Sequence, residues 1–220
     1  MTSLIKTTPV GYAQQAFNPK MGEVHGTEVA LEFDGAAESA RKAVLGVTDV
    51  SCFQRFGVKG PQAAAYLASQ SLKTPAEINS WIEGAAGTLV LRLGGSEFLI
   101  EDQYKANACA NLASFSNVAV PGAYKVARAD AAFILSGGEV LNLLSELCSL
   151  DLRDSALASD AVVMTQVAGI SATLLRQQLN GEQVYRIWCD GTYGPYMWDM
   201  LLEIAKELGG GAVGLSCHFK

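Results

Sequence analysis

Hydrophobic and polar positions follow the same succession twice along the chain. The first copy runs from Phe56-Gly57-Val58-Lys59-Gly60 into residues 61–67, and the second runs from Phe133-Ile134-Leu135-Ser136-Gly137 into residues 138–144. Equivalent positions lie 77 residues apart at both ends of the match. In each copy a short apolar strand ends at a glycine. The segment that follows has apolar residues at i, i+3 and i+4, a spacing that is typical of a helix. The pattern therefore predicts an internal strand–turn–helix repeat.

A hairpin follows each copy of the repeat. Apolar runs at 88–93 and 98–100 are separated by Gly94-Gly95, and runs at 173–176 and 184–188 are separated by Asn180-Gly181. Asn-Gly between two such runs predicts a two-residue type I′ turn. Each hairpin precedes a second predicted helix, over residues 104–115 and 195–208, and the later helix has a proline near its start and three glycines after its end.

The predicted order β-α-β-β-α, given twice, is the order of a split ferredoxin-like half. We therefore expect an α+β fold with largely antiparallel sheets, forming a single domain over residues 1–220 with halves at about 46–115 and 125–208. Residues 1–35 mix glycine, proline, asparagine and glutamine with short apolar groups, and are predicted to form an irregular N-terminal arm. A helix is predicted to follow the arm over residues 36–45.

Composition narrows the class of protein. Half of the 220 residues are hydrophobic and 17% are charged, which provides a packed core and excludes a disordered chain. The net charge of −6 with scattered basic residues argues against nucleic acid as a partner. No secretory signal and no apolar run of about 20 residues is present, so we expect a cytoplasmic protein with no membrane partner. The five cysteines form no C-x-x-C pair and are interpreted as reduced thiols.

Few residues suggest chemistry directly. The two histidines, His25 and His218, have no partner at metal-ligand spacing, so no metal site is predicted. Asp49-Val50-Ser51-Cys52 is interpreted as a turn before a strand rather than as a thiol site with a nearby acid. The segment from Asp190 to Tyr196 contains Tyr193, two glycines and a proline. It is either a tight turn whose tyrosines cap the core or an aromatic loop at a ligand or subunit surface, where tyrosine is enriched.

Several motifs resemble the folate-binding superfamily of the glycine cleavage T-protein, an aminomethyltransferase. The segment Asp49-Val50-Ser51 followed by Val58-Lys59-Gly60-Pro61 and Tyr66-Leu67 is similar to its first signature. Further similarities follow in consistent order from about residue 46 to residue 220: Leu91-Arg92-Leu93, Phe98-Leu99, Gly181-Glu182, Trp198, Leu201-Leu202 and Gly214-Leu215. The resemblance implies a T-protein-like folate-binding domain that lacks the family's C-terminal barrel.

Departures from the family pattern bear on activity. The family has a catalytic Asp just before the Leu-x-Arg-Leu strand, and the matching place here holds Ala86-Gly87. Aminomethyl transfer by the family mechanism is therefore not supported, and no catalytic residue is assigned. The family's folate-contacting Glu matches Glu182, which is otherwise interpreted as a plain hairpin residue. The Arg that follows the family's Gly-Leu corresponds to His218 here. A histidine cannot form the two parallel hydrogen bonds that an arginine makes with a carboxylate.

In length, the chain resembles the gamma subunit of heterotetrameric sarcosine oxidase. This resemblance implies a non-catalytic subunit of a one-carbon amine-oxidising complex, whose partners are larger flavin- and folate-binding subunits. The alternative is a stand-alone tetrahydrofolate-binding protein or aminomethyltransferase-like enzyme, using Glu182 with Glu101 or Asp102. In either case the implied cofactor is tetrahydrofolate, and the candidate binding residues are Glu182, Tyr193, Tyr196 and His218.

Overall fold

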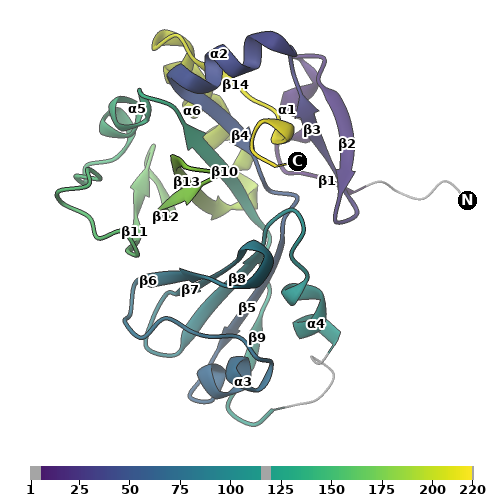
Figure 1. Ribbon diagram of the computed structural model, residues 1–220, viewed down its shortest axis with the longest axis vertical. Helices are drawn as coiled ribbons and strands as arrows, with labels where there is room; N and C mark the ends of the chain where they lie inside the picture. Colours follow the sequence, from purple (N-terminus) through teal and green to yellow (C-terminus); the bar gives the residue numbers. More distant parts are fainter. Residues whose placement is uncertain (1–5, 115–119, 220) are drawn as a thin grey trace, which may run out of the picture. The chain divides into compact units, whose positions relative to one another are not determined.

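The computed structural model describes residues 6–114 and 120–219, shown in Figure 1. The chain divides into two compact units. The first comprises residues 1–52, 130–159 and 163–220, and the second comprises residues 53–129 and 160–162. Each unit contains its own large sheet, and a small third sheet is formed by the N-terminal strands. The mixed α+β class predicted from the sequence is confirmed.

The first unit is built on a six-stranded sheet with the order β11-β12-β13-β10-β4-β14. Most of its neighbouring strands are antiparallel, and β14 joins β4 in parallel. The strands are β4 (Gly46–Asp49), β10 (Asp130–Ser136), β11 (Val162–Val167), β12 (Ile170–Leu179), β13 (Glu182–Asp190) and β14 (Gly211–Ala212).

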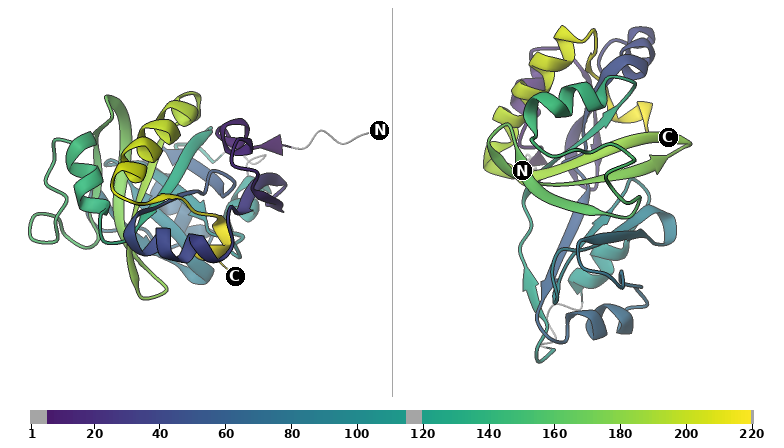
Figure 2. Two further views of the ribbon diagram at one scale, coloured as in Figure 1. Left: turned by 90° about the horizontal axis from the view of Figure 1, so that it is seen from above. Right: turned by 90° about the vertical axis from the view of Figure 1, so that its left-hand side faces the viewer.

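Two helices, α5 (Val140–Leu147) and α6 (Gly194–Glu207), cover one face of this sheet, as Figure 2 shows. Alternate strand residues such as Phe133, Leu174 and Ile187 point into the core beneath the helices. Trp198 of α6 is fully buried and its ring lies 6.2 Å from that of Phe133. The helices predicted after the second strand–turn unit and after the second hairpin therefore supply the apolar cover of the sheet.

The second unit contains a five-stranded antiparallel sheet with the order β6-β7-β8-β5-β9. The helices α3 (Ala63–Ser69) and α4 (Ala108–Ser114) enclose a smaller core in which Phe56, Leu67 and Leu112 are buried. The helix predicted over 104–115 begins later, at Ala108, and residue 115 lies outside the described residues. The strands are β5 (Gln54–Lys59), β6 (Ser80–Glu83), β7 (Thr88–Arg92), β8 (Glu97–Asp102) and β9 (Tyr124–Val126).

The prediction that residues 1–35 are irregular is wrong for the residues described. They form β1 (Lys6–Thr7), α1 (Gly11–Gln15), β2 (Lys20–Val24) and β3 (Thr27–Glu32), and the three strands pair in the order β1-β3-β2. The hairpin turns at His25 and Gly26, which both have positive φ. His-Gly adopts here the conformation that Asn-Gly favours in type I′ turns, and the sequence analysis did not recognise it.

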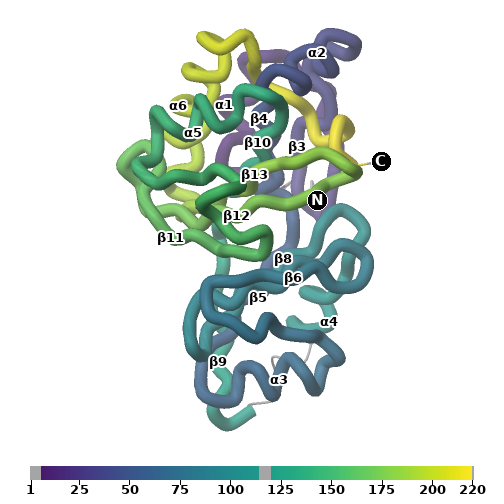
Figure 3. The backbone as a smooth tube through the Cα atoms, turned by 60° about the vertical axis from the view of Figure 1, so that its left-hand side comes forward, coloured from purple at the N-terminus to yellow at the C-terminus, as the bar shows by residue number. Residues whose placement is uncertain are grey.

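The internal repeat is present, with more strands than the sequence predicted. β5-α3-β6-β7-β8-α4 in the second unit corresponds to β10-α5-β11-β12-β13-α6 in the first, so each copy contains one additional strand, β6 or β11, before its hairpin. The strands that precede the copies are exchanged between the sheets. β4 pairs with β10 and leads along the chain into β5, whereas β9 pairs with β5 and leads into β10, a path that can be followed in Figure 3.

Two further local predictions, a helix and a turn, are confirmed. The helix predicted over residues 36–45 is α2 (Ala36–Leu45), and the Asn180-Gly181 turn has positive φ at both residues, as type I′ requires. Gly209 has a φ of 85° and directly follows the C-terminal cap of α6. All five cysteines are free. Within the described residues no helix is long and apolar enough to cross a membrane.

Candidate functional site

A polar cluster lies at the turn end of the β12–β13 hairpin. Glu182 is the first residue of β13, directly after the Asn180-Gly181 turn, and Lys42 projects from the last turn of α2. The Lys42 Nζ lies 2.6 Å from a carboxylate oxygen of Glu182 and donates a 3.2 Å hydrogen bond to the Cys217 carbonyl. The α2 lysine thus joins the hairpin to the C-terminal segment. Glu182 is therefore more than a solvated turn residue.

His218 belongs to the same cluster. It follows the 3-10 turn η4 (Leu215–Cys217), and its carbonyl accepts a 2.7 Å hydrogen bond from the Asn180 side chain. The imidazole is 3% exposed, and its Nε2 has no hydrogen-bond partner among the described residues. Burial, reinforced by the charges of Lys42 and Arg186, lowers the His218 pKa to about 3. The imidazole is consequently neutral at physiological pH.

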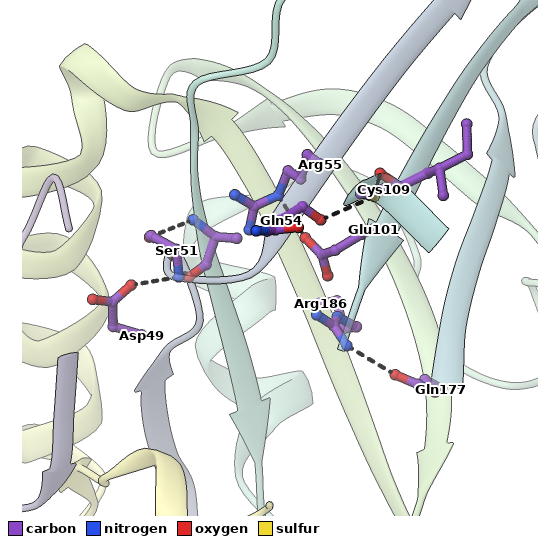
Figure 4. A network of polar contacts seen from close by, with 10 residues as sticks. Asp49, Ser51, Gln54, Arg55, Glu101, Cys109, Gln177 and Arg186 are labelled. Carbon is purple, nitrogen blue, oxygen red and sulfur yellow. Dashed lines mark hydrogen bonds and ion pairs between the residues drawn. The ribbon is translucent and has the colours of Figure 1, made fainter. Parts of the chain in front are cut away.

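Arg186 adds a buried cation that the sequence analysis missed. Tyr185 and Ile187 belong to the core beneath α5 and α6, so strand alternation puts Arg186 on the opposite face of β13. Its Nη1 donates a 3.3 Å hydrogen bond to Gln177 of β12, as Figure 4 shows, and its guanidinium carbon lies 5.3 Å from the centroid of the Trp188 ring. An arginine inside the apolar run Val184–Trp188 was the signal available in the sequence, because buried arginines require specific partners.

Glu38 fixes the C-terminal segment from the other side. Its carboxylate is buried on α2 and accepts backbone hydrogen bonds from Phe33 at 2.6 Å and from Gly214 at 2.9 Å. The Cys217 thiol lies 3.5 Å from the same carboxylate. Burial and this carboxylate raise the Cys217 pKa to about 11, so the thiol is not a nucleophile at neutral pH.

The chemistry of the cluster favours binding over catalysis. Lys42 is a partly exposed cation beside Glu182 and the Cys217 carbonyl, and a cation at the surface suits an anionic group. His218 has a pKa too low to take a proton near neutral pH, so it is poorly matched to general-base catalysis. A neutral imidazole with an unused ring nitrogen is instead suited to one more hydrogen bond.

The two predicted tyrosines lie at the other end of β13. Tyr193 ends the 3-10 turn η3 (Gly191–Tyr193), and Tyr196 lies in the first turn of α6, where its hydroxyl donates a 3.2 Å hydrogen bond to the Ala168 carbonyl. β13 has nine residues, which span about 26 Å at about 3.3 Å per step. The structure therefore brings Glu182 and His218 together but keeps both tyrosines away from them.

The second unit has carboxylates near the place where the resemblance expects a catalytic Asp. Ala86 occupies that place, in the turn η1 (Ala85–Gly87) before β7. Asp102 of β8 accepts hydrogen bonds from the Thr88 hydroxyl at 2.9 Å and from the Cys109 backbone N–H at 2.6 Å. Both of its oxygens therefore have donors within the unit. Asp102 serves as a structural cap at the start of α4.

Glu101 and Cys109 also have structural partners. Glu101 is buried on β8, and its carboxylate lies 2.6 Å from the Nε of Arg55 on β5. The Cys109 thiol donates to the Gln54 carbonyl at 3.4 Å, as drawn in Figure 4. Burial and the Asp102 charge raise the pKa of this thiol far above its ordinary value. Neither residue is arranged as a reactive group.

Asp49 and Ser51 form a turn in the first unit, as the sequence interpretation favoured. The Asp49 carboxylate accepts a 2.9 Å hydrogen bond from the Ser51 backbone N–H and a 3.1 Å bond from the Gln14 side chain. The Ser51 hydroxyl in turn accepts from the Ala132 backbone N–H at 2.9 Å. Burial raises the Asp49 pKa above its usual range despite these donors. The motif links β4 to β10, as Figure 4 shows.

No metal centre is found in the part of the chain that the structure describes. Residues 6–114 and 120–219 contain no group of three or more His, Cys, Asp and Glu side chains placed to hold an ion.

Comparison with known proteins identifies the fold. No protein-family model matches the sequence, and no curated protein matches it. Among solved structures, the aminomethyltransferase T of the glycine cleavage system from Bartonella henselae is similar, with a TM-score of 0.73 and 20% identity over 97% of this chain. The match covers 61% of that protein, so the present chain spans under two thirds of its length.

A second similar structure is the heterotetrameric sarcosine oxidase from Corynebacterium sp. U-96 in complex with pyrrole 2-carboxylate. The TM-score is 0.68 with 19% identity, and the match covers 94% of this chain and 97% of that one. Together the two similarities confirm the T-protein-like fold that the sequence motifs predicted.

Proposed function

We propose that this chain is a non-catalytic, gamma-type subunit of a sarcosine oxidase-like complex that oxidises N-methyl amines in the cytoplasm. The observation that carries the proposal is the match to a chain of the heterotetrameric sarcosine oxidase, which covers nearly the whole of both chains. The larger aminomethyltransferase is matched over only part of its length. The free cysteines agree with a reducing compartment.

The absence of a catalytic group in the described candidate sites supports a non-catalytic role. Ala86 has no ionisable side chain, and the nearby Asp102 is held by Thr88 and the backbone of α4. His218 is a weak base with a pKa of about 3. Proton transfer at neutral pH requires a group with a pKa near the working pH, which neither Ala86 nor His218 provides. In the proposed complex, flavin chemistry belongs to the larger subunits.

Recovery of the complex from the organism that encodes the chain tests this proposal. The tagged chain is expressed at its natural level and purified, and the eluate is measured for flavin absorbance and for sarcosine-dependent hydrogen peroxide formation. We expect stoichiometric flavoprotein with oxidase activity, and a strain with the untagged chain controls for proteins that bind the resin. A tagged chain that elutes alone as a flavin-free monomer contradicts the proposal.

The second candidate function is a stand-alone tetrahydrofolate-binding protein, and the polar cluster favours it. Tetrahydrofolate carries carboxylates on its glutamate tail, and Lys42, whose side chain is 21% exposed, can pair with an anionic group of this kind. Glu182 already forms an ion pair with Lys42. It would therefore take part in ligand binding only through this lysine, which would contact Glu182 and the ligand together. When bound, the cofactor would supply the one-carbon acceptor, and the chain's own residues would hold its carboxylates.

Calorimetric titration of the purified chain with tetrahydrofolate distinguishes the two candidates. Binding by the stand-alone protein should release heat, and the affinity should fall in Lys42→Met but not in Lys206→Met, which removes an exposed lysine of α6. Titration without heat at high micromolar ligand excludes the stand-alone function and leaves the subunit proposal unaffected.

A further inference from the structure

Three exposed tyrosines of the first unit, Tyr12, Tyr193 and Tyr196, form what we call the tyrosine surface. Their exposed fractions are 89%, 51% and 47%. Single exposed apolar side chains are common on soluble proteins, but large aromatic groups gathered in one place mark interaction surfaces. Tyrosine in particular is enriched where one protein docks on another.

Close packing brings together the two segments that carry the three tyrosines. Gly194, between Tyr193 and Tyr196 in sequence, lies against the turn that leads into α1. A Cβ placed on Gly194 would come 2.8 Å from the Pro9 Cβ and 3.5 Å from the Val10 Cγ1. Because Val10 caps α1 and Tyr12 lies in that helix, Tyr12 is within a short reach of the tyrosines that flank Gly194. The absence of a side chain at Gly194 permits this contact.

Tyr196 and the turn that carries Tyr193 are held in a defined conformation. The Tyr196 hydroxyl is hydrogen-bonded to the Ala168 carbonyl in the turn between β11 and β12. Asp190 accepts hydrogen bonds from both the backbone N–H and the hydroxyl of Thr192, which fixes the turn that carries Tyr193. An aromatic group that is ordered before binding loses little conformational entropy when a partner covers it.

The charges beside the tyrosine surface are acidic. Asp190 precedes Tyr193, and Asp199 and Glu203 follow Tyr196 on the exposed side of α6, at the spacing that puts helical residues on one face. The Thr192 hydrogen bonds hold the pKa of Asp190 below its usual range, so this carboxylate stays charged. The nearest lysine of α6, Lys206, has its Nζ 5.2 Å from the Phe17 ring centroid. Aromatic rings beside carboxylates complement a surface that presents arginine, which stacks on tyrosine and pairs with carboxylates.

We propose that the tyrosine surface docks an arginine-bearing surface of the flavin-carrying subunit, with Tyr12, Tyr193 and Tyr196 as anchors and Asp190, Asp199 and Glu203 as the acidic rim. This inference rests on the proposed function and deepens it by naming the surface through which the chain joins the complex. Nucleic acid is an unsuitable occupant because the rim would repel phosphates. Tyr193 and Tyr196 thus act in assembly rather than in cofactor binding.

The experiment compares variants of the tagged chain in the recovery assay and in a titration with the purified flavoprotein. Tyr12→Ala and Tyr193→Ala remove anchors for which the structure records no side-chain hydrogen bond, so both variants should fold, as circular dichroism will check. Each variant should bind the flavoprotein more weakly, with an apparent Kd about 10-fold higher or more, which is the effect of losing an interface anchor. Tyr124→Ala is the matched control, because Tyr124 is 60% exposed in the second unit.

The acidic rim is tested by salt. Raising the ionic strength should weaken binding of the wild-type chain, and the double variant Asp199→Asn/Glu203→Gln should bind more weakly and respond less to salt. If Tyr12→Ala and Tyr193→Ala bind the flavoprotein as tightly as the wild-type chain, or no more weakly than Tyr124→Ala, the inference is wrong while the proposed function stands. A wild-type chain that recovers no flavoprotein overturns both.

Discussion

Gly60 and Gly137 are equivalent residues of the internal repeat, and each lies against a backbone carbonyl that leaves no room for a side chain. A Cβ on Gly60 would be 2.4 Å from the Gly122 oxygen, and a Cβ on Gly137 would be 2.5 Å from the Val44 oxygen. The same carbonyls accept hydrogen bonds from the backbone N–H groups of Gln62 and Glu139, at 2.8 and 2.9 Å. The exchanged strands β9 and β4 are therefore anchored in the same way in both units.

This geometry predicts that Gly137→Ala is strongly destabilising. The residue has a φ of 105°, which alanine rarely adopts, and the added methyl group would displace the chain before β4. Strain and overpacking together should lower the free energy of unfolding by about 3 kcal/mol, measured by urea denaturation. Gly138→Ala is the control, because a Cβ there meets nothing within 4 Å. Equal losses in the two variants would show that the carbonyl contact is unimportant.

The repeat was predictable because its determinants are local. Gly60 and Gly137 stand at the end of an apolar run in each copy, and Asn180-Gly181 specifies a two-residue turn through its own backbone preferences. The exchange of β4 and β9 was not predictable, because a strand's partner is chosen by contacts with residues distant in sequence. The strands β6 and β11 were missed for a related reason, since both lie at sheet edges and have mixed polar and apolar residues.

The polar cluster was predictable only in part. Glu182 and His218 were identified through the family resemblance, and the structure brings them to the same place. Lys42 was not identified, because a lysine in the last turn of a helix is usually a solvated residue. Arg186 was overlooked within an apolar strand. The partners of Lys42, which are Glu182 and Cys217, come from elements distant in sequence, whereas Gln177 and Trp188, which contact Arg186, belong to the same hairpin.

The Lys42–Glu182 ion pair should make a measurable contribution to stability. The two side chains are 21% and 35% exposed, so solvent screens the pair only partly. A double-mutant cycle with Lys42→Met and Glu182→Gln should give a coupling energy of about 1 kcal/mol that decreases at high salt. The Lys20–Glu32 pair is the control, because its side chains are 74% and 40% exposed and 3.9 Å apart, and its coupling should be close to zero. Equal coupling in the two cycles would contradict the structural distinction.

Asp49→Asn should preserve stability at neutral pH, whereas Asp49→Ala should lower it. Alanine leaves the buried Gln14 amide and the Ser51 N–H without their acceptor, which should cost about 2 kcal/mol. Asparagine keeps the acceptor for Ser51, and rotation of the Gln14 amide lets its oxygen, which has no partner among the described residues, accept from the new amide. Urea denaturation of both variants measures the difference.

The raised pKa of Asp49 gives that comparison a pH dependence. Between the unfolded pKa of 3.8 and the higher pKa of the native state, the unfolded chain has lost the Asp49 proton while the native carboxyl retains it. The stability contributed by this group therefore declines as pH rises from the first pKa to the second. Asp49→Asn removes the decline. The wild-type chain should therefore be relatively more stable than this variant at acidic pH and lose that advantage toward neutral pH. An unchanged difference between pH 4 and pH 7 would contradict the assignment.

His218 should make the chain less stable as pH falls. Burial and the charges of Lys42 and Arg186 lower its pKa from 6.5 to about 3, so between these values the unfolded chain binds a proton that the native chain does not. The free energy of unfolding should decrease as pH falls below 6.5 by up to about 1.4 kcal/mol per pH unit for this one group. His218→Gln does not titrate and keeps a hydrogen-bonding side chain, so subtracting its profile removes the contribution of the carboxylates. Identical slopes for the wild-type chain and His218→Gln between pH 6 and pH 4.5 would show that His218 is protonated in the native state, and that the cluster at the hairpin holds a cation there instead of a neutral imidazole.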